Sequence, residues 1–432
     1  MKCLWLLLLT VITSISGFAQ KIDRLRLDSL FDRLSTNNLA IGTICITQNG
    51  RIVYQRPIGK DQTAGTAYRI GSITKVFTAV LIYELIDQKK LTFENTLGEF
   101  FPELSNSGRI TIAEMLGHRS GLANFTAPAT KFDSWKFQPQ TQEQLLGYIR
   151  SQQPDFAPND KADYNNSNFL LLGYILEKTY HKPYKDIVQE RIIRKLGLPN
   201  TYYGERAGFE GRETASFKYA DNQWKQEQAV YLDNFGGAGA MISTPQDLCY
   251  FIKAIFDGKF ISKSSLDRMT RIEKDGYGWG MFPYGDSLYR GYGHNGKTEG
   301  FASSIQYYPD SKLAISYCTS GEVYSKDIIL NDVFKICVQE PIELPTFDTV
   351  TLTQQQLQPL TGTYTGDNDL QVSSSIINGR LVIAVKGQPF ALDALSDHEF
   401  RNVRFGFFFE FQDGGKQLVV HDVETTYWLH KQ

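Results

Sequence analysis

Two motifs that mark well-known hydrolase classes are missing from this chain. It has no G-x-S-x-G, the turn that carries the nucleophile of an α/β-hydrolase, and no H-E-x-x-H, the helical histidine pair that binds zinc in metallopeptidases. Its six histidines are not clustered. We therefore expect neither class of enzyme, no metal ion and no cofactor.

The chain also has no excess of basic residues and few cysteines. Lys plus Arg total 45 against 47 Asp plus Glu, with a formal net charge of -2, so there is no basic excess to neutralise phosphates and we expect no nucleic acid partner. The five cysteines include no C-x-x-C pair. Disulfides are permitted but not implied among the four that follow the N-terminal region, which are Cys45, Cys249, Cys318 and Cys337. Cys45 and Cys318 lie in apolar, strand-like runs, which favours buried free thiols.

The N-terminal residues have the pattern of a secretory signal. An apolar stretch from Leu4 to about Ile15 follows a basic residue and precedes the small residues Gly17 and Ala19. We predict that residues 1–19 are a signal peptide, cleaved after Ala19. An N-terminal membrane anchor is the alternative, but the apolar run is short for a span. The prediction places the protein in the periplasm or outside the cell, with no stable membrane span after cleavage.

The rest of the chain divides into a large part and a small one. With 432 residues, it is long enough for one large domain and something smaller. Two β-rich runs between 40 and 54 flank Asn49-Gly50, a strong hairpin signal. Residues 93–230 show helical stretches and few strand signals, which predicts a mostly helical insertion. The elements expected after it are a helix starting at Thr244-Pro245, two strands within 302–318 and a helix over about 326–339.

Beyond this point the pattern becomes almost entirely β. The stretch 341–356 begins with two prolines and reads as a linker. After it come a hairpin signal at Asn378-Gly379 and alternating apolar runs, so we expect a small antiparallel barrel or sandwich over 357–432. Together these patterns predict an α+β main domain over 20–340 and a small all-β C-terminal domain.

Ser72 and Lys75 form the only Ser-x-x-Lys in the chain, at the start of an apolar helix expected over 72–88. Three residues apart on a helix, the two side chains share one face. The ordinary alternative is a capping serine followed by a solvated lysine. A lysine in the first turn opposes the helix dipole, however, and this helix is too apolar to have a wet face. Because burial and the positive helix end would lower the pKa of the amine, we predict Ser72 as the nucleophile and Lys75 as its proton acceptor.

Two further patterns could complete such a site. Tyr164 and Asn166 form the only Tyr-x-Asn and precede a helical run. On their own they indicate a turn, but a tyrosine beside a lysine can be partly deprotonated and shuttle protons, while an amide can hold a substrate carbonyl. His294 is followed two residues later by Gly296, which would let a substrate backbone approach a strand closely. A lone histidine is more often structural, so the other motifs decide its interpretation.

The three motifs together resemble those of a known family. Ser72-Ile-Thr-Lys75, Tyr164-Asn-Asn166 and His294-Asn-Gly296 resemble, in order and separation, the motifs of the penicillin-recognising serine hydrolases, which include class C β-lactamases, D-alanyl-D-alanine carboxypeptidases and related esterases. Connecting segments similar to those of the family lie at 116–122, 195–204 and 236–248. The resemblance implies a β-lactamase/transpeptidase-like fold, in which helices and a helical subdomain flank an antiparallel sheet. The C-terminal part resembles small barrel domains often appended to this family.

The resemblance also implies roles for individual residues. Ser72 would be acylated, and Lys75 and Tyr164 would share the base and leaving-group acid roles. The backbone N–H groups of Ser72 and Lys297, on an edge strand, would form the oxyanion hole. The implied substrate-binding residues are Asn166, His294 and Gly296. The substrate would be a small molecule or a peptide, including peptidoglycan-derived ones.

His294 departs from the β-lactamase pattern, in which many members have a lysine that holds the antibiotic's carboxylate. A histidine is only partly charged near neutral pH, so its hold on an anion should be weaker and pH-dependent. We therefore predict an acyl-enzyme hydrolase of a peptide, ester or β-lactam, with a D-Ala-D-Ala peptidase or esterase favoured over an efficient β-lactamase. The alternative is a non-catalytic binding or regulatory protein of the same fold, although such members usually lose a key side chain that this chain keeps.

Overall fold

The structure, a computed structural model, describes residues 22–205, 209, 213–220, 223–273, 275–366, 370–385, 387–403, 407–421 and 426–432. The predicted signal peptide, residues 1–19, lies outside these residues. Among the helices described, none combines the length and apolar character needed to cross a bilayer.

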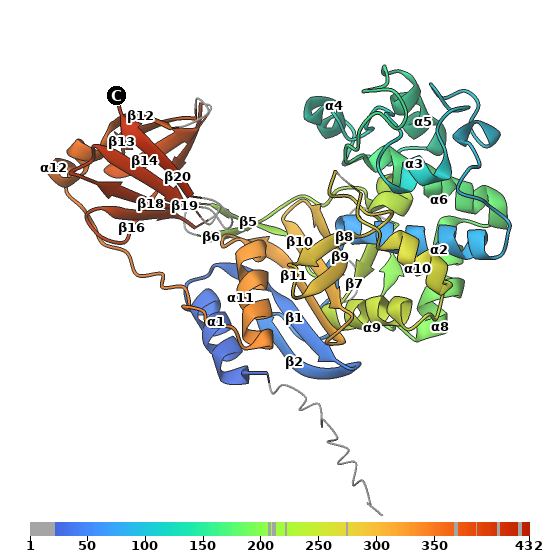
Figure 1. Ribbon diagram of the computed structural model, residues 1–432, viewed down its shortest axis with the longest axis horizontal. Coiled ribbons are helices and arrows are strands. Elements are labelled where there is room, and N and C mark those ends of the chain that lie inside the picture. The colour runs from blue at the N-terminus through green and yellow to red at the C-terminus, as the bar shows by residue number, and fades with distance from the viewer. Residues whose placement is uncertain are drawn as a thin grey trace, which may run out of the picture.

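An antiparallel sheet forms the centre of the larger part, with the strand order β2-β1-β11-β10-β9-β8 among the described residues. Helices α1 and α11 cover one face, and α9 packs on the other beside the helical region (Figure 1). The strands are β1 Ala40–Gln48, β2 Arg51–Ile58, β8 Phe282–Gly285, β9 Arg290–Thr298, β10 Phe301–Tyr308 and β11 Leu313–Glu322. The covering helices are α1 Arg24–Thr36, α9 Pro245–Phe256 and α11 Lys326–Val338.

Local sequence signals set several boundaries of this part. Asn49 and Gly50 both have positive φ and join β1 to β2, which confirms the predicted hairpin. Thr244 caps α9 by accepting the N–H of Asp247 at 3.2 Å, as expected for a threonine before a proline at the first helical position. Cys45, Cys249, Cys318 and Cys337 are buried free thiols in the described structure. This agrees with the free thiols expected for Cys45 and Cys318.

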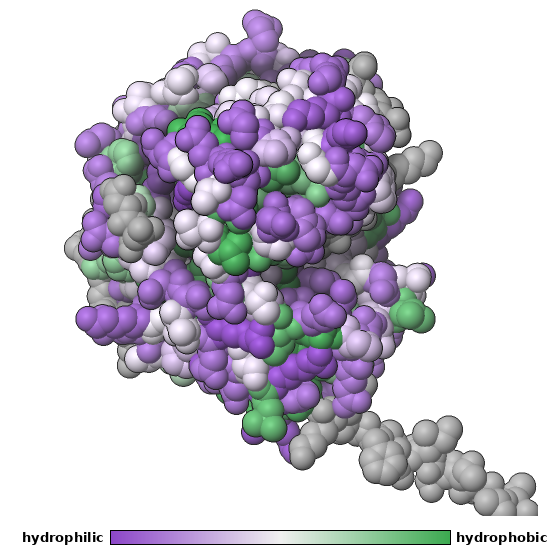
Figure 2. All heavy atoms as spheres, turned by 90° about the vertical axis from the view of Figure 1, so that its left-hand side faces the viewer, coloured by the Kyte–Doolittle hydropathy of each residue, from purple (hydrophilic) through white to green (hydrophobic). Residues whose placement is uncertain are grey.

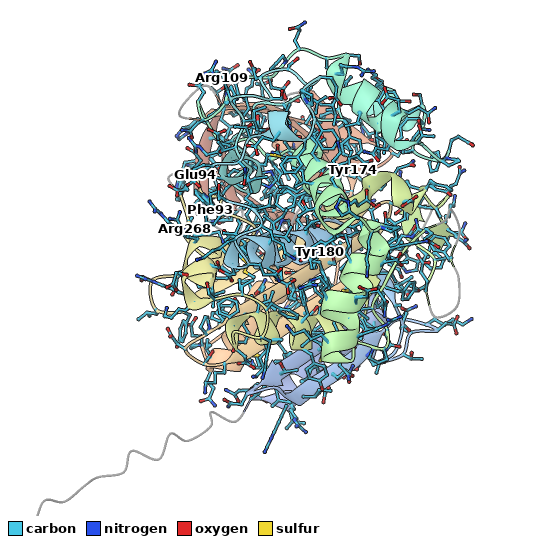
Figure 3. All side chains as sticks on the ribbon, turned by 90° about the vertical axis from the view of Figure 1, so that its right-hand side faces the viewer. Phe93, Glu94, Arg109, Tyr174, Tyr180 and Arg268 are labelled. Carbon is cyan, nitrogen blue, oxygen red and sulfur yellow. The ribbon has the colours of Figure 1, made fainter. Side chains whose placement is uncertain are left out.

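The helical region holds α2 in its interior. Helix α2 (Thr74–Asp87) is buried almost all round, as its apolar sequence predicts. The other helices are α3 Ile112–Leu116, α4 Ala129–Asp133, α5 Gln142–Arg150, α6 Asn166–Tyr180, α7 Tyr184–Val188, α8 Arg194–Leu196 and α10 Lys263–Met269. On the outer face shown in Figure 3, Arg268 of α10 lies 4.8 Å over the ring of Phe93, which ties α10 to the loop before α3.

Short strands in this region were not foreseen. A small sheet joins β3 (Tyr68–Arg69), β7 (Met241–Ser243) and β4 (Tyr202–Tyr203). A separate hairpin pairs β5 (Phe217–Ala220) with β6 (Gln223–Gln226). Strands of two to four residues are too short to show an alternating pattern, so the sequence alone predicts only the helices here.

The C-terminal region is a nearly closed β-barrel. Its strands run in the order β15-β14-β13-β12-β20-β19-β18-β17-β16 among the described residues. Because the outermost strands β15 and β16 follow one another directly in the chain, the two edges of the sheet must meet. The strands are β12 Gly362–Gly366, β13 Gln371–Ile377, β14 Arg380–Val385, β15 Gln388–Ala391, β16 Asp393–Ala394, β17 Glu399–Asn402, β18 Phe407–Gln412, β19 Gln417–His421 and β20 Thr426–Lys431.

The segment between the two regions is extended and anchored. Arg33 of α1 donates to the carbonyls of Leu344 and Pro345 at 3.1 and 2.9 Å, so the segment is fastened to the larger part. Helix α12 (Gln354–Leu357) leads into the barrel. The surface at the barrel end is mostly hydrophilic, with apolar side chains in small separate patches (Figure 2). We keep 20–340, 341–356 and 357–432 as proposed domain boundaries.

Candidate active site

Ser72 and Lys75 lie at the junction of a short 3₁₀ turn and a buried helix. Ser72 is in η1 (Gly71–Ile73), and Lys75 is in the first turn of α2. The Nζ atom of Lys75 lies 2.9 Å from the Oγ atom of Ser72. The three-residue spacing therefore brings the two groups into hydrogen-bonding contact, as the sequence predicts.

Two further groups surround the Lys75 amine. Its Nζ lies 2.8 Å from Asn166 Oδ1 and 2.8 Å from the backbone carbonyl of Ala238. Both oxygens can only accept hydrogen bonds, and a neutral amine has two N–H groups to give them. The lone pair of that amine is then left to receive the Ser72 hydroxyl proton. Complete burial lowers the pKa of Lys75 well below its usual value, which favours this neutral form.

The Asn166 amide is oriented by a chain of hydrogen bonds. Its Nδ2 donates to Thr126 Oγ1 at 2.9 Å, and the Thr126 hydroxyl donates to Asn124 Oδ1 at 2.9 Å. With Thr126 committed as donor to Asn124, its oxygen must accept from the Asn166 amide nitrogen. The amide oxygen of Asn166 is thereby turned toward Lys75.

Tyr164 reaches the same serine from the segment before α6. Its ring centroid lies 5.0 Å from Lys75 Nζ, and its hydroxyl is near enough to the Ser72 hydroxyl for that group to affect its pKa. Burial raises the pKa of Tyr164, and the nearby Ser72 hydroxyl offsets this only in part. The expectation of a partly deprotonated tyrosine is therefore wrong, because desolvation outweighs any help from a lysine that is itself neutral. Tyr164 is a phenol that can donate its proton.

His294 lies on β9, which is not the edge strand that was predicted. Strand β8 is the edge, but it pairs only with the first half of β9, from Arg290 to Gly293. From His294 onward, β9 has no strand beyond it in the described residues and packs instead against η1. The second half of β9, which includes Lys297, therefore lies against the nucleophile segment although β9 is an inner strand.

The His294 ring is neutral in this setting. It is 2% exposed, and its Nδ1 atom lies 2.5 Å from the carbonyl of Asn295, so Nδ1 carries the hydrogen and Nε2 is an acceptor. Burial, and secondly the nearby Lys75, lower the pKa of His294 to about 3. The prediction of a partly charged histidine near neutral pH is wrong, because desolvation was invisible in the sequence.

Glycines allow β9 and the nucleophile segment to touch. A Cβ atom on Gly296 would lie 1.9 Å from the carbonyl oxygen of Ile70, and one on Gly71 would lie 2.8 Å from the backbone nitrogen of Lys297. Gly71 also has a φ of 48°, which disfavours other residues. The absence of a side chain at Gly296 thus lets the backbone at Ile70 approach β9. The sequence had predicted only that a substrate would approach there. The contact places the Lys297 backbone next to Gly71, the residue before Ser72.

A pocket of about 450 Å³ opens beside this centre. Its wall includes Asn166 and Lys297, and it continues between aromatic side chains and charged groups. The lining also includes Phe132, Lys136, Phe137, Glu227, Phe235 and Glu299. A larger hollow lies between the start of α1 and the end of α11 and contains none of the predicted site residues. In the part of the chain described, no three His, Cys, Asp or Glu side chains gather as a metal site.

The sequence predictions missed three contributors to the site. The carbonyl of Ala238 was hidden because backbone groups carry no sequence label, and Thr126 because its partner is 40 residues away. His118 lies against Tyr164, with ring centroids 4.6 Å apart. The segments around Ala238 and His118 had been noted only as connecting stretches, and that similarity was the available signal.

The sequence resembles a known protein family and several of its characterised members. The family profile described as Beta-lactamase matches residues 27–334. A penicillin-binding protein of Bacillus subtilis (strain 168) is 25% identical over 358 residues, which span 74% of this chain and 78% of that protein. A teichoic acid D-alanine hydrolase of Staphylococcus aureus is 24% identical over 333 residues, 73% of this chain and 78% of that protein.

The fold similarity extends beyond the matched residues. The structure of an octameric penicillin-binding protein homologue from Pyrococcus abyssi superposes with a TM-score of 0.66 at 19% identity. It covers 94% of this chain and 99% of that one, so the match includes most of the C-terminal barrel region. At this identity the likeness concerns the fold.

Proposed function

The chain belongs to the Beta-lactamase family and is a serine hydrolase, and on that premise we propose that Ser72 forms an acyl-enzyme with a peptide, amide or ester substrate. The observation that carries the proposal is the set of three oxygens around Lys75 Nζ. In the neutral amine that we propose, Asn166 and Ala238 take the two N–H groups, and the lone pair faces the Ser72 hydroxyl 2.9 Å away. Such an amine is a general base poised on its nucleophile.

Each proton has a place in the proposed reaction. Lys75 accepts the proton of Ser72 as Oγ bonds to the substrate carbonyl carbon. The backbone N–H groups of Ser72 and Lys297 hold the oxyanion, at about 3 kcal/mol per donor. Tyr164 gives its proton to the departing nitrogen or oxygen as that bond breaks, and Lys75 restores it. Water then attacks the ester, and the same groups act in reverse to release Ser72.

The neutral state of His294 favours substrates that have no carboxylate beside the scissile bond. A neutral ring with an Nε2 acceptor has no charge and no hydrogen to offer an anion at this position. Penicillins and C-terminal peptides both present a carboxylate to enzymes of this kind. We therefore favour an esterase or amidase over an efficient β-lactamase, and place a D-Ala-D-Ala carboxypeptidase second.

We expect the preference between a neutral and an anionic ester to stay constant between about pH 5 and about pH 8. The ratio of the two kcat/KM values removes the shared dependence on Lys75, so it reports the charge of His294. In His294→Lys the ratio should shift about tenfold toward the anionic ester, since a charged donor replaces a neutral acceptor. A ratio in the wild type that swings toward the anion as pH falls through about 6.5 would contradict a neutral His294.

The pocket contains an unused carboxylate. Glu227 is half-buried on its wall, and no hydrogen bond or ion pair to its side chain is present in the described structure. Glu299 is already paired with Arg69 at 3.0 Å, and Lys136 with Asp133 at 2.5 Å. The carboxylate charge of Glu227 therefore remains available to a ligand, and an ammonium group is its natural partner. This feature favours an amino acyl group as the acyl donor, which agrees with the D-alanine named for one relative.

Glu227→Gln should lower kcat/KM for D-alanine esters or anilides about tenfold and leave their N-acetyl forms unchanged. The reason is that acetylation removes the ammonium that Glu227 would bind. Glu103→Gln is the matched control, because Glu103 is an exposed glutamate away from the pocket. Equal losses for free and acetylated substrates would show that Glu227 does not select an ammonium.

The proposal as a whole is tested by comparing an ester, a D-alanine anilide and benzylpenicillin as substrates of the wild type and of Ser72→Ala. We expect turnover of the ester or the anilide that vanishes in Ser72→Ala, with penicillin the slowest. Turnover retained by Ser72→Ala would show that Ser72 is not the nucleophile. Penicillin turned over fastest would reverse the preference drawn from His294. Peptidoglycan-derived fragments are included among possible natural substrates, and the predicted signal would take the chain to the periplasm or outside the cell to meet them.

A further inference from the structure

His118 holds the segment that carries Tyr164 at three points. Its carbonyl accepts the N–H of Asp163 at 2.9 Å, and its Nδ1 atom accepts the N–H of Asn165 at 3.1 Å. Between these two bonds, its ring packs on the ring of Tyr164 with centroids 4.6 Å apart and planes at 36°. One residue thus contacts the tyrosine and both of its chain neighbours.

The local backbone explains how His118 reaches this position. Helix α3 ends at Leu116 with Gly117 as its C-cap, and His118 follows with a φ of 57°, which turns the chain back after the helix. The side chain is 3% exposed and also packs 5.2 Å from the Phe169 ring of α6. The ring therefore lies between the end of one helix and the start of the next, in a fixed place.

The other described neighbours of the Tyr164 ring lie farther from it than His118, including Lys75 Nζ at 5.0 Å. The Tyr164 ring lies 6.1 Å from Phe282 and 6.3 Å from His294, against 4.6 Å from His118. These two neighbours come from the central sheet and make no hydrogen bond to the Tyr164 segment in the described structure. Of these ring neighbours in the described structure, His118 alone also forms hydrogen bonds to the backbone on both sides of Tyr164.

The hydrogen bond to Asn165 requires an unprotonated Nδ1 atom. A charged imidazole would donate at both nitrogens and lose this acceptor. Burial lowers the pKa of His118 well below its usual value, and any positive charge on the nearby Lys75 or His294 would lower it further, which agrees with the geometry. Asn165 itself caps α6 through Ser167, so the same bond connects His118 to the helix start that presents Asn166.

We propose that His118 is a positioning residue that fixes Tyr164 over Ser72 through its ring and its Nδ1 acceptor. It touches no reacting atom, so it acts through Tyr164. The inference rests on the proposed function, in which Tyr164 transfers the leaving-group proton. A phenol displaced by about 1 Å can cost about 100-fold in rate while substrate binding is preserved.

Two substitutions separate the two features of His118. His118→Phe keeps a ring for stacking but has no acceptor, and His118→Asn keeps an acceptor near the Nδ1 position but has no ring. We expect kcat for the ester to fall about 10- to 100-fold in His118→Phe with KM nearly unchanged, and to be partly restored in His118→Asn. The control is His181→Phe, because His181 also has a positive φ, of 53°, and lies on the surface.

A double-mutant cycle with Tyr164→Phe decides whether His118 acts through the tyrosine. If it does, His118→Phe will cost little further in the Tyr164→Phe background, since the group it positions is already gone. Additive losses, or an unchanged kcat in His118→Phe, would overturn the inference, as would a loss in His118→Phe when Tyr164→Phe alone has no effect. Labelling of Ser72 by a fluorophosphonate in each variant verifies a folded site. Absence of labelling in the wild type would instead contradict the proposed function.

Discussion

Lys75→Met will lose at least about 1,000-fold in the rate of Ser72 acylation, the largest effect we expect from a single side chain other than Ser72 itself. Methionine fills the buried space of the lysine but provides no proton acceptor. Stopped-flow measurement of the first turnover of a p-nitrophenyl ester isolates this step. The matched control is Lys60→Met, because Lys60 is exposed and outside the site.

The pH dependence of the acylation rate of the wild type also tests whether Lys75 is the base. Acylation needs the neutral amine, so the rate is lost as pH falls through the pKa of Lys75 and is kept above it. Since burial lowers that pKa, the acid limb must lie well below about pH 10.4, where an ordinary lysine would titrate. A Lys75→Met variant that retained more than a tenth of the rate, or an acid limb near the ordinary value, would remove Lys75 as the base.

Gly296→Ala is the second substitution with a large expected effect. Its new Cβ atom would lie 1.9 Å from the Ile70 carbonyl and 2.5 Å from Ser303 Oγ, whose hydroxyl donates to that carbonyl at 2.9 Å. Neither neighbour is a flexible chain end, so β9 must move away from η1. We expect about 100-fold slower acylation, because one oxyanion donor is displaced, and about 1–3 kcal/mol lower free energy of unfolding.

Gly147→Ala provides the control for this variant. Gly147 lies in helix α5, and a Cβ atom there would meet nothing within 4 Å. Alanine should therefore stabilise the helix by about 1 kcal/mol and leave acylation unchanged. If Gly296→Ala acylates as fast as the wild type, the contact between β9 and the nucleophile segment does not form the oxyanion hole.

The sequence predicts the parts of the site that are set by local geometry. Ser72 and Lys75 share a helix face because helical spacing puts them there, and Thr244 starts α9 because a threonine before a proline caps a helix. The barrel followed from turn signals and alternating strands. Each of these inferences depends on residues close together in the chain.

The remaining features depend on contacts between distant segments. The neutrality of His294 arises from burial beside Phe282 and Lys75, and the carbonyl of Ala238 reaches Lys75 across 163 positions. His118 acts on a residue 46 positions later, through ring packing and a backbone bond. Local pattern cannot reveal burial or such pairings, so the protonation states of the site were predicted incorrectly for His294 and Tyr164.

The intact mass of the protein after incubation with a fluorophosphonate, a labelled penicillin and a short-chain ester tests the central claim most directly. The account predicts a single adduct with the fluorophosphonate or the ester in the wild type, mapped to Ser72 and absent from Ser72→Ala. An adduct that persists in Ser72→Ala would place the nucleophile elsewhere. The absence of any adduct in the wild type would contradict the acyl-enzyme and return the chain to the non-catalytic alternative.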